Sequence, residues 1–364
     1  MDSIQRYGAP VLAVCGFSGS GKTTLLEAAI SHLVRRGLSV AVVKHDAHGV
    51  VMDTPGKDSD RLFRAGASIA LRGPDQQLHR RNASAALSLS ATLAWLARDH
   101  DLLLVEGHKD TPLPKFWLEN ASRVAVPDSV TNVVATLPWD GPRVAAFLSY
   151  IDSWLPVSWC ERPLYRGILV GGMSSRMGSP KQLLRIGNRQ LGEIVARALD
   201  TDLRSGPVVA LGAGALPQSL ENLPRVADCP GFEGPCAGIV AAHRWAPEAA
   251  WIVAACDHPW LRPATIEWLA SQRRPGTWAV IPRQPDGNPC PTLALYEPQS
   301  LTALERIASE NPKYVVRLAS LLDNPRTSII TPPAEHEKAW SSINTPEEFN
   351  KTLLEAEQNP LGAN

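Results

Sequence analysis

The sequence predicts two consecutive α/β domains, the first built on a parallel sheet with helices on both faces and the second with the same alternation of strands and helices. Three observations indicate this fold class. The chain has 364 residues, more than one ordinary hydrophobic core accommodates. Apolar runs typical of buried strands alternate with helical patterns along its length. Two different glycine-rich turns, at residues 16–23 and 169–181, each follow such an apolar run.

The first predicted domain covers residues 8–158. Its strands are expected at residues 10–16, 38–45, 68–73 and 101–107. A helix is expected between the first two strands, because apolar side chains recur there on one helical face and Gly37 is placed to end it. This face comprises Leu25, Leu26, Ala29, Ile30, Leu33 and Val34. Residues 84–100 form a second helical pattern.

The domain boundary is predicted near Glu161. Residues 136–165 combine one short helix, turn residues and a proline-bearing connector. The second domain is expected over residues 163–356, again with alternating elements. Its strands are predicted at residues 165–172, 206–212, 250–257, 277–283 and 292–296, and its helices at residues 234–246, 263–274 and 300–310. Residues 358–364 are expected to fray.

The composition excludes several classes of protein. Lysine plus arginine equals aspartate plus glutamate, 36 each, so a general nucleic-acid-binding surface is not expected. The sequence contains neither an apolar run long enough to cross a membrane nor a signal peptide, which favours a cytoplasmic protein. The six cysteines form no CxxC pair, so they are expected to be reduced and buried rather than part of a zinc or redox site.

The first glycine-rich turn matches the phosphate-binding pattern GxxxxGK[ST] between a strand and a helix. Glycines let backbone N–H groups close around phosphate oxygens, and the start of the helix adds its positive dipole end. Lys22 is expected to reach the β- and γ-phosphates, and the Thr23 hydroxyl to bind Mg²⁺. The predicted nucleotide-binding residues here are Gly16, Gly19, Ser20, Gly21, Lys22, Thr23 and Thr24. The first domain is therefore predicted to be a P-loop NTPase.

A carboxylate is expected to complete this Mg²⁺ site. Asp46, Asp53 and Glu106 each follow an apolar strand, at the sheet edge where ligands bind. Glu106 is the first choice and Asp53 the second metal candidate. The alternative interpretation is that each is a solvent-exposed acid at the end of a strand and binds no metal.

Three blocks in the first domain carry a more specific resemblance. VVKHDAHG, DTPGKDSDRLFRAGA and LLLVEGHKDTPLPK follow one another over residues 42–115. Together with the P-loop they resemble the molybdopterin-guanine dinucleotide biosynthesis adaptor family. The resemblance implies a GTP-binding domain with weak GTPase activity. It also implies candidates around the nucleotide, which are Lys44, Asp53, Lys57, Asp58 and Glu106.

The second glycine-rich turn, LVGGMSSRMGSPK, is neither a P-loop nor GxGxxG. Gly171 and Gly172 end the strand and let backbone approach a phosphate or a base. Arg176 and Lys181 add two positive charges, which suit attack at an α-phosphorus with pyrophosphate leaving. Asp257 directly follows the strand at residues 250–257 and is the expected Mg²⁺ ligand. Its neighbours Cys256 and His258 are expected in the core and a turn, not in a zinc site.

This turn resembles the signature of nucleotidyltransferases, and the later blocks RVADCPGFEGPCAGI, AACDHPWL, PTLALYEP and SSINTPEEF narrow the resemblance to molybdenum cofactor guanylyltransferases. It implies a Rossmann-like nucleotidyltransferase domain. The implied guanine and ribose contacts are Leu169, Val170 and Gly171, with Gly172 beside them; Arg176 and Lys181 contact phosphates, Asp228 contacts nucleotide and Asp257 holds the metal. Lys181, Arg176 and Asp257 are the predicted catalytic residues. Asp228 is alternatively a capping aspartate.

Two departures bear on the choice of base. Pro180 stands where the family usually has aspartate, as in cytidylyltransferase relatives, and Asn288 occupies a position that is often histidine. The LVGG turn and the GPCAGI block favour guanine, so GTP is the expected substrate and CTP the alternative. Trp95, Trp251 and Trp268 fall within predicted elements, which favours core packing over a stacking surface for a pterin.

The two resemblances together imply one pathway. The second domain is expected to transfer GMP from GTP to molybdopterin or Mo-molybdopterin, with the first domain as a GTP-binding accessory. Molybdenum-insertion proteins and apo-molybdoenzymes are the implied partners, and a homodimer stays open. The alternatives are a cytidylyl- or sugar-nucleotidyltransferase fused to a P-loop NTPase, and a non-catalytic GTP-dependent cofactor chaperone.

Overall fold

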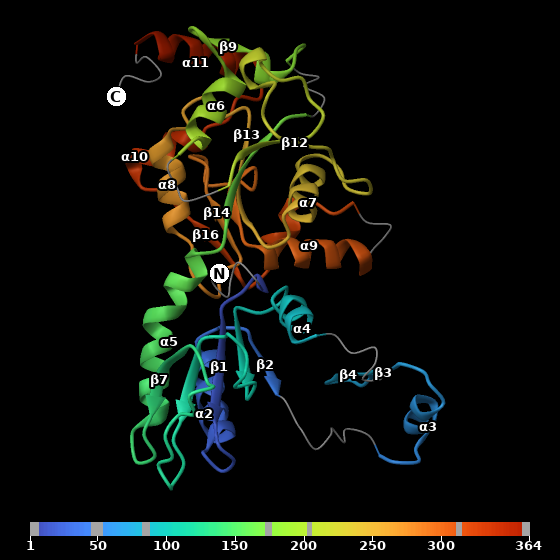
Figure 1. Cartoon of the computed structure of the whole chain (residues 1–364). Helices are drawn as coiled ribbons and strands as arrows, with labels where there is room; N and C mark the ends of the chain where they lie inside the picture. The colour runs from blue at the N-terminus through green and yellow to red at the C-terminus, as the bar shows by residue number, and fades with distance from the viewer. Residues whose placement is uncertain are drawn as a thin grey trace.

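The computed structural model describes residues 7–44, 54–81, 88–171, 177–201, 206–310 and 315–358. Two main sheets follow one another along the chain and occupy opposite ends of the molecule (Figure 1). The first has five strands in the order β2-β5-β1-β6-β7, and the second has seven in the order β12-β11-β8-β13-β15-β14-β16. The predicted fold class, two α/β units, is confirmed. The boundaries 8–158 and 163–356 stay a prediction.

The first sheet is entirely parallel, so the carboxyl ends of its strands share one edge. Its strands are β1 (Val11–Gly16), β2 (Val40–Lys44), β5 (Leu102–Glu106), β6 (Lys115–Leu118) and β7 (Val133–Leu137). Buried side chains of α2 (Lys22–Arg35) and α5 (Arg143–Cys160) pack together on one face. The helix α4 (Leu89–Leu96) covers the other face through Leu93.

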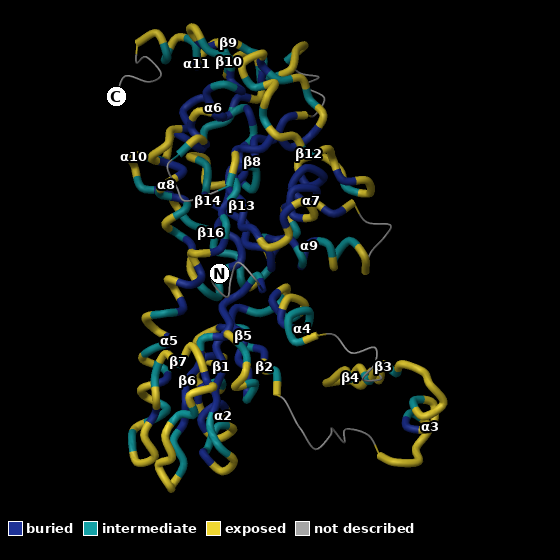
Figure 2. The backbone as a smooth tube through the Cα atoms, viewed as in Figure 1, coloured by how far each residue is buried: buried dark blue, intermediate teal, exposed yellow. Residues whose placement is uncertain are grey.

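A separate arm leaves the first sheet after β2. It consists of α3 (Asp58–Arg64) and the antiparallel pair β3 (Ile69–Arg72) and β4 (Gln77–Arg80). The arm stands apart from the five-stranded sheet and is mostly exposed (Figures 1 and 2). The strand predicted at residues 68–73 is therefore a strand, but it does not join the main sheet.

The connection between the two sheets is a helix rather than a loop. Where a short helix and a connector are predicted, α5 runs for 18 residues and continues through Pro156. Proline removes one helical hydrogen bond. Ile151, Leu155 and Trp159 are all buried, and the packing of this face maintains the helix across Pro156.

The second sheet is mixed. Its strands are β8 (Leu164–Leu169), β11 (Val208–Leu211), β12 (Arg225–Val226), β13 (Ala250–Ala255), β14 (Ala279–Pro282), β15 (Leu293–Tyr296) and β16 (Thr327–Ile330). Only β15 runs antiparallel to its neighbours, β13 and β14. The other strands therefore share one carboxyl edge, where β8, β11 and β13 end side by side.

Helices cover both faces of the second sheet. α6 (Leu191–Leu199) and α8 (Pro263–Ser271) pack on one face, and α7 (Pro235–Trp245) and α9 (Pro298–Glu310) on the other. Further elements are the small pair β9 (Arg185–Ile186) and β10 (Arg189–Gln190), and the helices α10 (Ala334–Glu337) and α11 (Pro346–Gln358). Short 3-10 helices lie at η2 (Lys181–Leu183), η3 (Gln218–Leu220), η4 (Leu318–Leu321) and η5 (Lys338–Trp340). In the described ranges, no helix is long and apolar enough to cross a membrane.

The predicted core packing of tryptophans holds in part. Trp251 is fully buried in β13, and Trp268, on α8, is partly buried against the core. Trp95 is 58% exposed on α4, so the prediction is wrong for this residue. Its helix has apolar side chains on more than one face, and the sequence alone does not distinguish the face that meets the sheet.

Candidate nucleotide sites

The first glycine-rich turn lies at the carboxyl end of β1 and leads directly into α2. Gly16 has φ +153°, and a Cβ there would come within 2.6 Å of the Leu118 carbonyl oxygen. Gly21, immediately before the helix, has φ +84°. Both positions therefore require glycine. The resulting loop has the strand–turn–helix geometry that holds polyphosphates.

Lys22 and Thr23 occupy the first two positions of α2. The Lys22 ammonium donates to the carbonyl oxygens of Gly16, at 3.1 Å, and Phe17, at 2.9 Å, so it lies over the loop. The Thr23 hydroxyl donates to Glu106 Oε1 at 3.1 Å. The structure thus brings together two residues that are 83 positions apart and were predicted to share a metal ion.

These two side chains fit a magnesium ion. A hydroxyl and a carboxylate oxygen lie side by side, and Mg²⁺ prefers such hard oxygen ligands and completes its octahedron with phosphate and water. The Lys44 ammonium, 3.8 Å from Glu106 Oε1, lies at the same strand ends. Asp53 and Asp46 fall outside the described residues.

Two other residues that were predicted to lie near a nucleotide at the P-loop are found elsewhere in the structure. Lys57 and Asp58 belong to the arm, which stands apart from the start of α2 (Figure 1). The Asp58 side chain is 98% exposed and its ion-pair partner is Arg61 on the same helix. In this structure the two residues do not contribute to the P-loop site.

Arg143, at the start of α5, is a residue that the sequence did not point to. Its guanidinium donates to four backbone carbonyl oxygens: Ser20 at 2.7 Å, Pro138 at 2.6 Å, Glu119 at 2.5 Å and Leu137 at 3.4 Å. It also lies 5.1 Å from the centre of the Trp139 ring. Arg143 therefore ties the glycine-rich turn to the loops that follow β6 and β7.

The second candidate site is a cavity of about 590 Å³ at the carboxyl edge of the seven-stranded sheet. Six residues predicted from the sequence line it: Leu169, Val170, Gly171, Lys181, Asp228 and Asp257. They come from the ends of β8, β12 and β13 and from the turn after β8. Gly172 and Arg176 fall outside the described residues. The predicted residues that the structure describes therefore meet around one space.

Lys181 and Asp257 form an ion pair at this cavity. Lys181 Nζ lies 2.8 Å from Asp257 Oδ2 and donates to Asn344 Oδ1 at 2.9 Å. The Lys181 and Asp257 side chains are only 18% and 16% exposed, so water screens the pair weakly. The ammonium is therefore held between the end of β13 and the segment before α11.

The sequence assigned no role to Asn344, which lines the cavity, or to Gln182, which follows Lys181. Asn344 lies in the SSINTPEEF block, whose resemblance was its signal. Gln182 is buried, and its side-chain amide donates to the Ala215 carbonyl oxygen at 2.8 Å. This contact holds the loop after β11 against the end of β8. Gly214 in that loop is obligatory, because a Cβ there would come within 2.8 Å of the Gly171 nitrogen.

The chemistry of the donor set at this cavity fits magnesium and not zinc. Asp257 offers a carboxylate at the mouth, and Mg²⁺ commonly binds through one or two carboxylates together with substrate phosphates. Burial raises the pKa of the Cys256 thiol to about 12, so no thiolate is available beside it. Among the described residues, no three histidine, cysteine, aspartate or glutamate side chains gather as a metal site.

Comparisons with known proteins divide the chain at the same place as its two sheets. The family model described as molybdopterin guanine dinucleotide synthesis protein B matches residues 11–138. The model described as a MobA-like NTP transferase domain matches residues 167–326.

Individual relatives agree with this division. The molybdopterin-guanine dinucleotide biosynthesis adapter protein of Haemophilus influenzae is 32% identical over 162 residues, which cover 40% of this chain and 89% of the relative. The probable molybdenum cofactor guanylyltransferase of Bacillus licheniformis is 31% identical over 182 residues, which cover 49% of this chain and 89% of the relative. A molybdenum cofactor biosynthesis bifunctional protein of Synechocystis is 27% identical over 195 residues, which cover 52% of this chain and 54% of the relative.

A strand–turn–helix phosphate loop in one half and a Lys181–Asp257 cavity in the other thus coincide with two separate family matches. The chain therefore belongs, through its N-terminal half, to the molybdopterin-guanine dinucleotide biosynthesis adapter family and, through its C-terminal half, to the MobA-like nucleotidyltransferases that include the molybdenum cofactor guanylyltransferases.

Proposed function

We propose that the C-terminal half transfers the GMP moiety of GTP to the terminal phosphate of molybdopterin or Mo-molybdopterin, giving molybdopterin guanine dinucleotide and pyrophosphate. The observation that carries this proposal is the cavity where Lys181 and Asp257 face the backbone of Leu169 to Gly171. A cation, an acid and a glycine-terminated strand end are the groups that a nucleoside triphosphate requires. Family membership supplies the identity of the acceptor.

The transfer needs only one displacement. A phosphate oxygen of molybdopterin forms a bond to the α-phosphorus of GTP, and the bond from that phosphorus to the oxygen bridging to the β-phosphate breaks. Pyrophosphate leaves with the electron pair. Lys181 binds the phosphate oxygens on which charge increases, and Asn344 orients its ammonium. Arg176 is proposed to add a second positive charge.

Two further features suit this reaction. Asp257 would hold a magnesium ion, which neutralises phosphate charge when bound. No covalent enzyme intermediate is required, and the buried Cys256 thiol, whose pKa burial raises to about 12, stays protonated beside the cavity. The acceptor phosphate is therefore the nucleophile.

The N-terminal half is proposed to bind GTP at Gly16 to Thr24, with magnesium held by Thr23 and Glu106, and to hydrolyse it weakly. Asp53 stays a further metal candidate. This half would assist transfer of the finished cofactor, and its proposed partners are molybdenum-insertion proteins and apo-molybdoenzymes. A cytoplasmic location and a homodimer belong to the same proposal.

The decisive experiment supplies the full-length chain with GTP, Mg²⁺ and molybdopterin and follows pyrophosphate release, with the product identified by mass. The expected product is molybdopterin guanine dinucleotide. The Lys181→Ala chain should be slowed by about 10²–10³-fold, whereas Arg185→Ala, which removes an exposed positive charge four residues further on, should keep full activity. Equal activity of the parent and Lys181→Ala chains would contradict the proposal.

The same assay separates the competing functions. Pro180 is the observation that keeps a cytidylyltransferase open, and CTP in place of GTP tests it. A cytidylyltransferase would release pyrophosphate with CTP and not with GTP. A non-catalytic chaperone would bind GTP and release no pyrophosphate with either nucleotide.

A further inference from the structure

The two halves meet through the amino edges of their sheets. In the first half the contact residues are Gly8, Gly37 and Asp101, which precede β1, β2 and β5. In the second half Trp278 and Arg326 immediately precede β14 and β16, and Arg162 lies two residues before β8. Because the strands of each sheet that begin here run away from the contact, their carboxyl ends point outwards from it (Figure 1).

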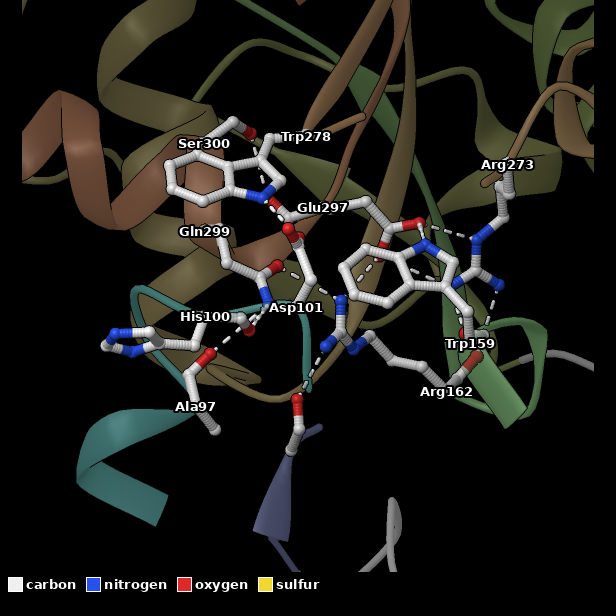
Figure 3. Close-up of polar contacts among 11 residues, drawn as sticks. Ala97, His100, Asp101, Trp159, Arg162, Arg273, Trp278, Glu297, Gln299 and Ser300 are labelled. Carbon is white, nitrogen blue, oxygen red and sulfur yellow. Dashed lines mark hydrogen bonds and ion pairs between the residues drawn. The ribbon is translucent and has the colours of Figure 1, made fainter. Parts of the chain in front are cut away.

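A buried charge cluster forms one part of this contact (Figure 3). The Glu297 carboxylate accepts hydrogen bonds from Arg162 Nη1 and Arg273 Nε, both at 2.8 Å, and from Trp159 Nε1 at 3.1 Å. The Glu297 and Arg162 side chains are completely buried. Burial alone would raise the pKa of Glu297, but Arg273 and Arg162 outweigh it and the pKa is lowered, so the carboxylate stays charged.

This cluster reaches across to the first half. Arg162 Nη2 donates to the Gly8 carbonyl oxygen at 2.6 Å. Gln299 accepts from Arg162 Nη1 at 3.1 Å and donates to the carbonyl oxygens of Ala97, at 3.2 Å, and His100, at 3.1 Å. The amino edge of the first sheet is thus hydrogen-bonded to Arg162 and Gln299 at two places (Figure 3).

A second buried carboxylate completes the contact from the other side. Asp101, in the first half, accepts from Trp278 Nε1 at 2.7 Å and from Arg326 Nη1 at 2.8 Å. Its side chain is completely buried, and the backbone N–H of Ser39, in the same half, donates to it at 2.7 Å. Arg326 also donates to the Gly37 carbonyl oxygen at 2.6 Å. Separation of the halves would leave Asp101 and Arg326 without each other, which is strongly unfavourable unless water replaces all the contacts. The ion-pair partners of Glu297 belong to its own half, so Glu297 acts on the contact by holding Arg162 in place.

The covalent link adds to this rigidity. The helix α5 is 18 residues long and ends at Cys160, and β8 begins at Leu164. Trp159, in the last turn of the helix, is fully buried and bonds to Glu297. The connection is therefore far shorter than the flexible linkers that allow domains to reorient.

We propose that the two halves form one rigid body docked amino edge to amino edge, so that the P-loop and the transferase cavity of one chain never meet. β1 and β8 are six residues each and run away from the contact. At about 3.3 Å per residue, two such strands in series separate the sites by on the order of 40 Å. A nucleotide or dinucleotide product leaving one site must enter solvent or another molecule before it reaches the other.

The docking itself does not depend on the proposed function, and only the identification of both sites as nucleotide sites rests on it. The P-loop edge of the N-terminal half faces away from the transferase cavity of its own chain. Whatever this half delivers to or receives from the transferase reaction therefore passes between molecules.

The test measures a distance, which requires no catalysis. Spin labels are attached to the Ser122→Cys and Ala213→Cys positions, exposed residues at the two outer sheet edges, in a Cys160→Ser chain. Excess unlabelled chain removes contributions from pairs between chains. Pulsed dipolar spectroscopy should give one narrow distribution centred on the order of 40 Å, unchanged by GTP and Mg²⁺. A broad distribution, or a shorter distance when GTP is added, would overturn the proposal.

Variants locate the cause of the rigidity. A chain with both Glu297→Ala and Asp101→Ala should show a broadened distribution. The matched control is Arg306→Ala, which removes an exposed ion pair to Asp99 at the rim of the same contact, 3.5 Å long, and should leave the distribution narrow. If the double variant fails to fold, Asp101→Asn provides the milder change, because it removes the charge that pairs with Arg326 across the contact. A distribution as narrow in Asp101→Asn and the double variant as in the control would show that the charges do not hold the halves together.

Discussion

Lys181 has two acceptors that hold its ammonium at the cavity, Asp257 at 2.8 Å and Asn344 at 2.9 Å. Their roles differ. Asp257 carries the charge that balances the lysine, whereas the Asn344 amide orients it and lies in a block that follows the whole second sheet. If Lys181 acts in transfer as proposed, its orientation depends on Asn344, which contacts it from a segment that follows the whole second sheet.

We expect Asn344→Ala to slow guanylyl transfer by about 10-fold and Lys181→Ala to slow it by about 10²–10³-fold, because loss of a preorganised charged donor costs more than loss of the group that orients it. Steady-state pyrophosphate release measures both. In the double variant, the Asn344 change should add little, since its effect acts through Lys181.

Asn344→Asp serves as the partner variant of the same size. It keeps an oxygen acceptor for Lys181 and should retain more activity than Asn344→Ala. Fully independent, multiplicative effects of the Lys181 and Asn344 changes would contradict this orienting role.

Arg143 plays a comparable part in the P-loop half. It holds the Ser20 carbonyl oxygen at 2.7 Å and ties the glycine-rich turn to the loops after β6 and β7. We expect Arg143→Ala to weaken GTP binding at the P-loop by about 10-fold, because four backbone carbonyl oxygens lose a charged donor. Titration with a GTP analogue in a Lys181→Ala chain measures this.

Arg123→Ala is the matched control for Arg143. Arg123 pairs with Asp140 in the same pair of loops, but its side chain is 68% exposed and contacts no P-loop residue in the described ranges. GTP affinity should stay within about two-fold of the parent, as is usual for an exposed ion pair. Equal losses in the two variants would indicate a general effect of loop charge.

At the scale of elements, the arm is held together by one buried carboxylate. Asp60 on α3 accepts from the Gly56 backbone nitrogen at 2.9 Å, from Arg64 Nε at 2.8 Å and from Arg80 Nη1 at 3.0 Å. Arg80 also stacks on Phe63, 3.8 Å from its ring centre. Asp60 and the Arg80–Phe63 contact therefore join the helix and the hairpin of the arm.

This anchor makes the arm sensitive to acid. The Gly56 N–H, followed by the two arginines, lowers the pKa of Asp60 from 3.8 to about 2. The stabilisation by a carboxylate with a lowered pKa is present above the unfolded value and is lost as the pH falls through the folded value. Pepsin cleavage within residues 54–81 should therefore increase between about pH 4 and pH 2.

Substitution tests the same anchor at neutral pH. Asp60→Asn should make the arm sensitive to trypsin at pH 7, where the parent resists. Asp58→Asn, which changes an acid on the same helix whose side chain is 98% exposed, should behave as the parent does. Identical cleavage of the two variants would rule out Asp60 as the anchor.

The sequence predicted the elements and residues whose determinants are local. The P-loop, the strands that end in Glu106 and Asp257, and the turn from Leu169 to Lys181 all follow from patterns within a few residues, and the structure brings those it describes to two sheet edges. Charge and hydrogen-bonding chemistry at a strand end is readable without knowledge of the fold.

Contacts and strand directions that depend on residues far away in the sequence could not be predicted. Arg143 contacts a carbonyl oxygen 123 positions away, and nothing near it in the sequence indicates this. The antiparallel direction of β15 depends on its neighbours β13 and β14 rather than on its own residues. The arm carries a strand pattern at residues 68–73, but the pattern does not say which sheet it joins.

At the scale of the whole molecule, the docking of the two amino edges predicts that the two nucleotide sites act independently within one chain. Lys22 covers the P-loop at one end, and Lys181 pairs with Asp257 at the other. Lys22→Ala should therefore remove GTP binding from the N-terminal half and leave guanylyl transfer to free molybdopterin within about two-fold of the parent, since removing a charge that lies far beyond the screening length has little effect on a remote site. Arg35→Ala, an exposed charge at the far end of the same helix, is the control for both measurements. Loss of transfer in Lys22→Ala with full transfer in Lys181→Ala would reverse the roles of the two halves, and loss in both would mean that the P-loop acts on the transferase cavity in spite of the distance between them.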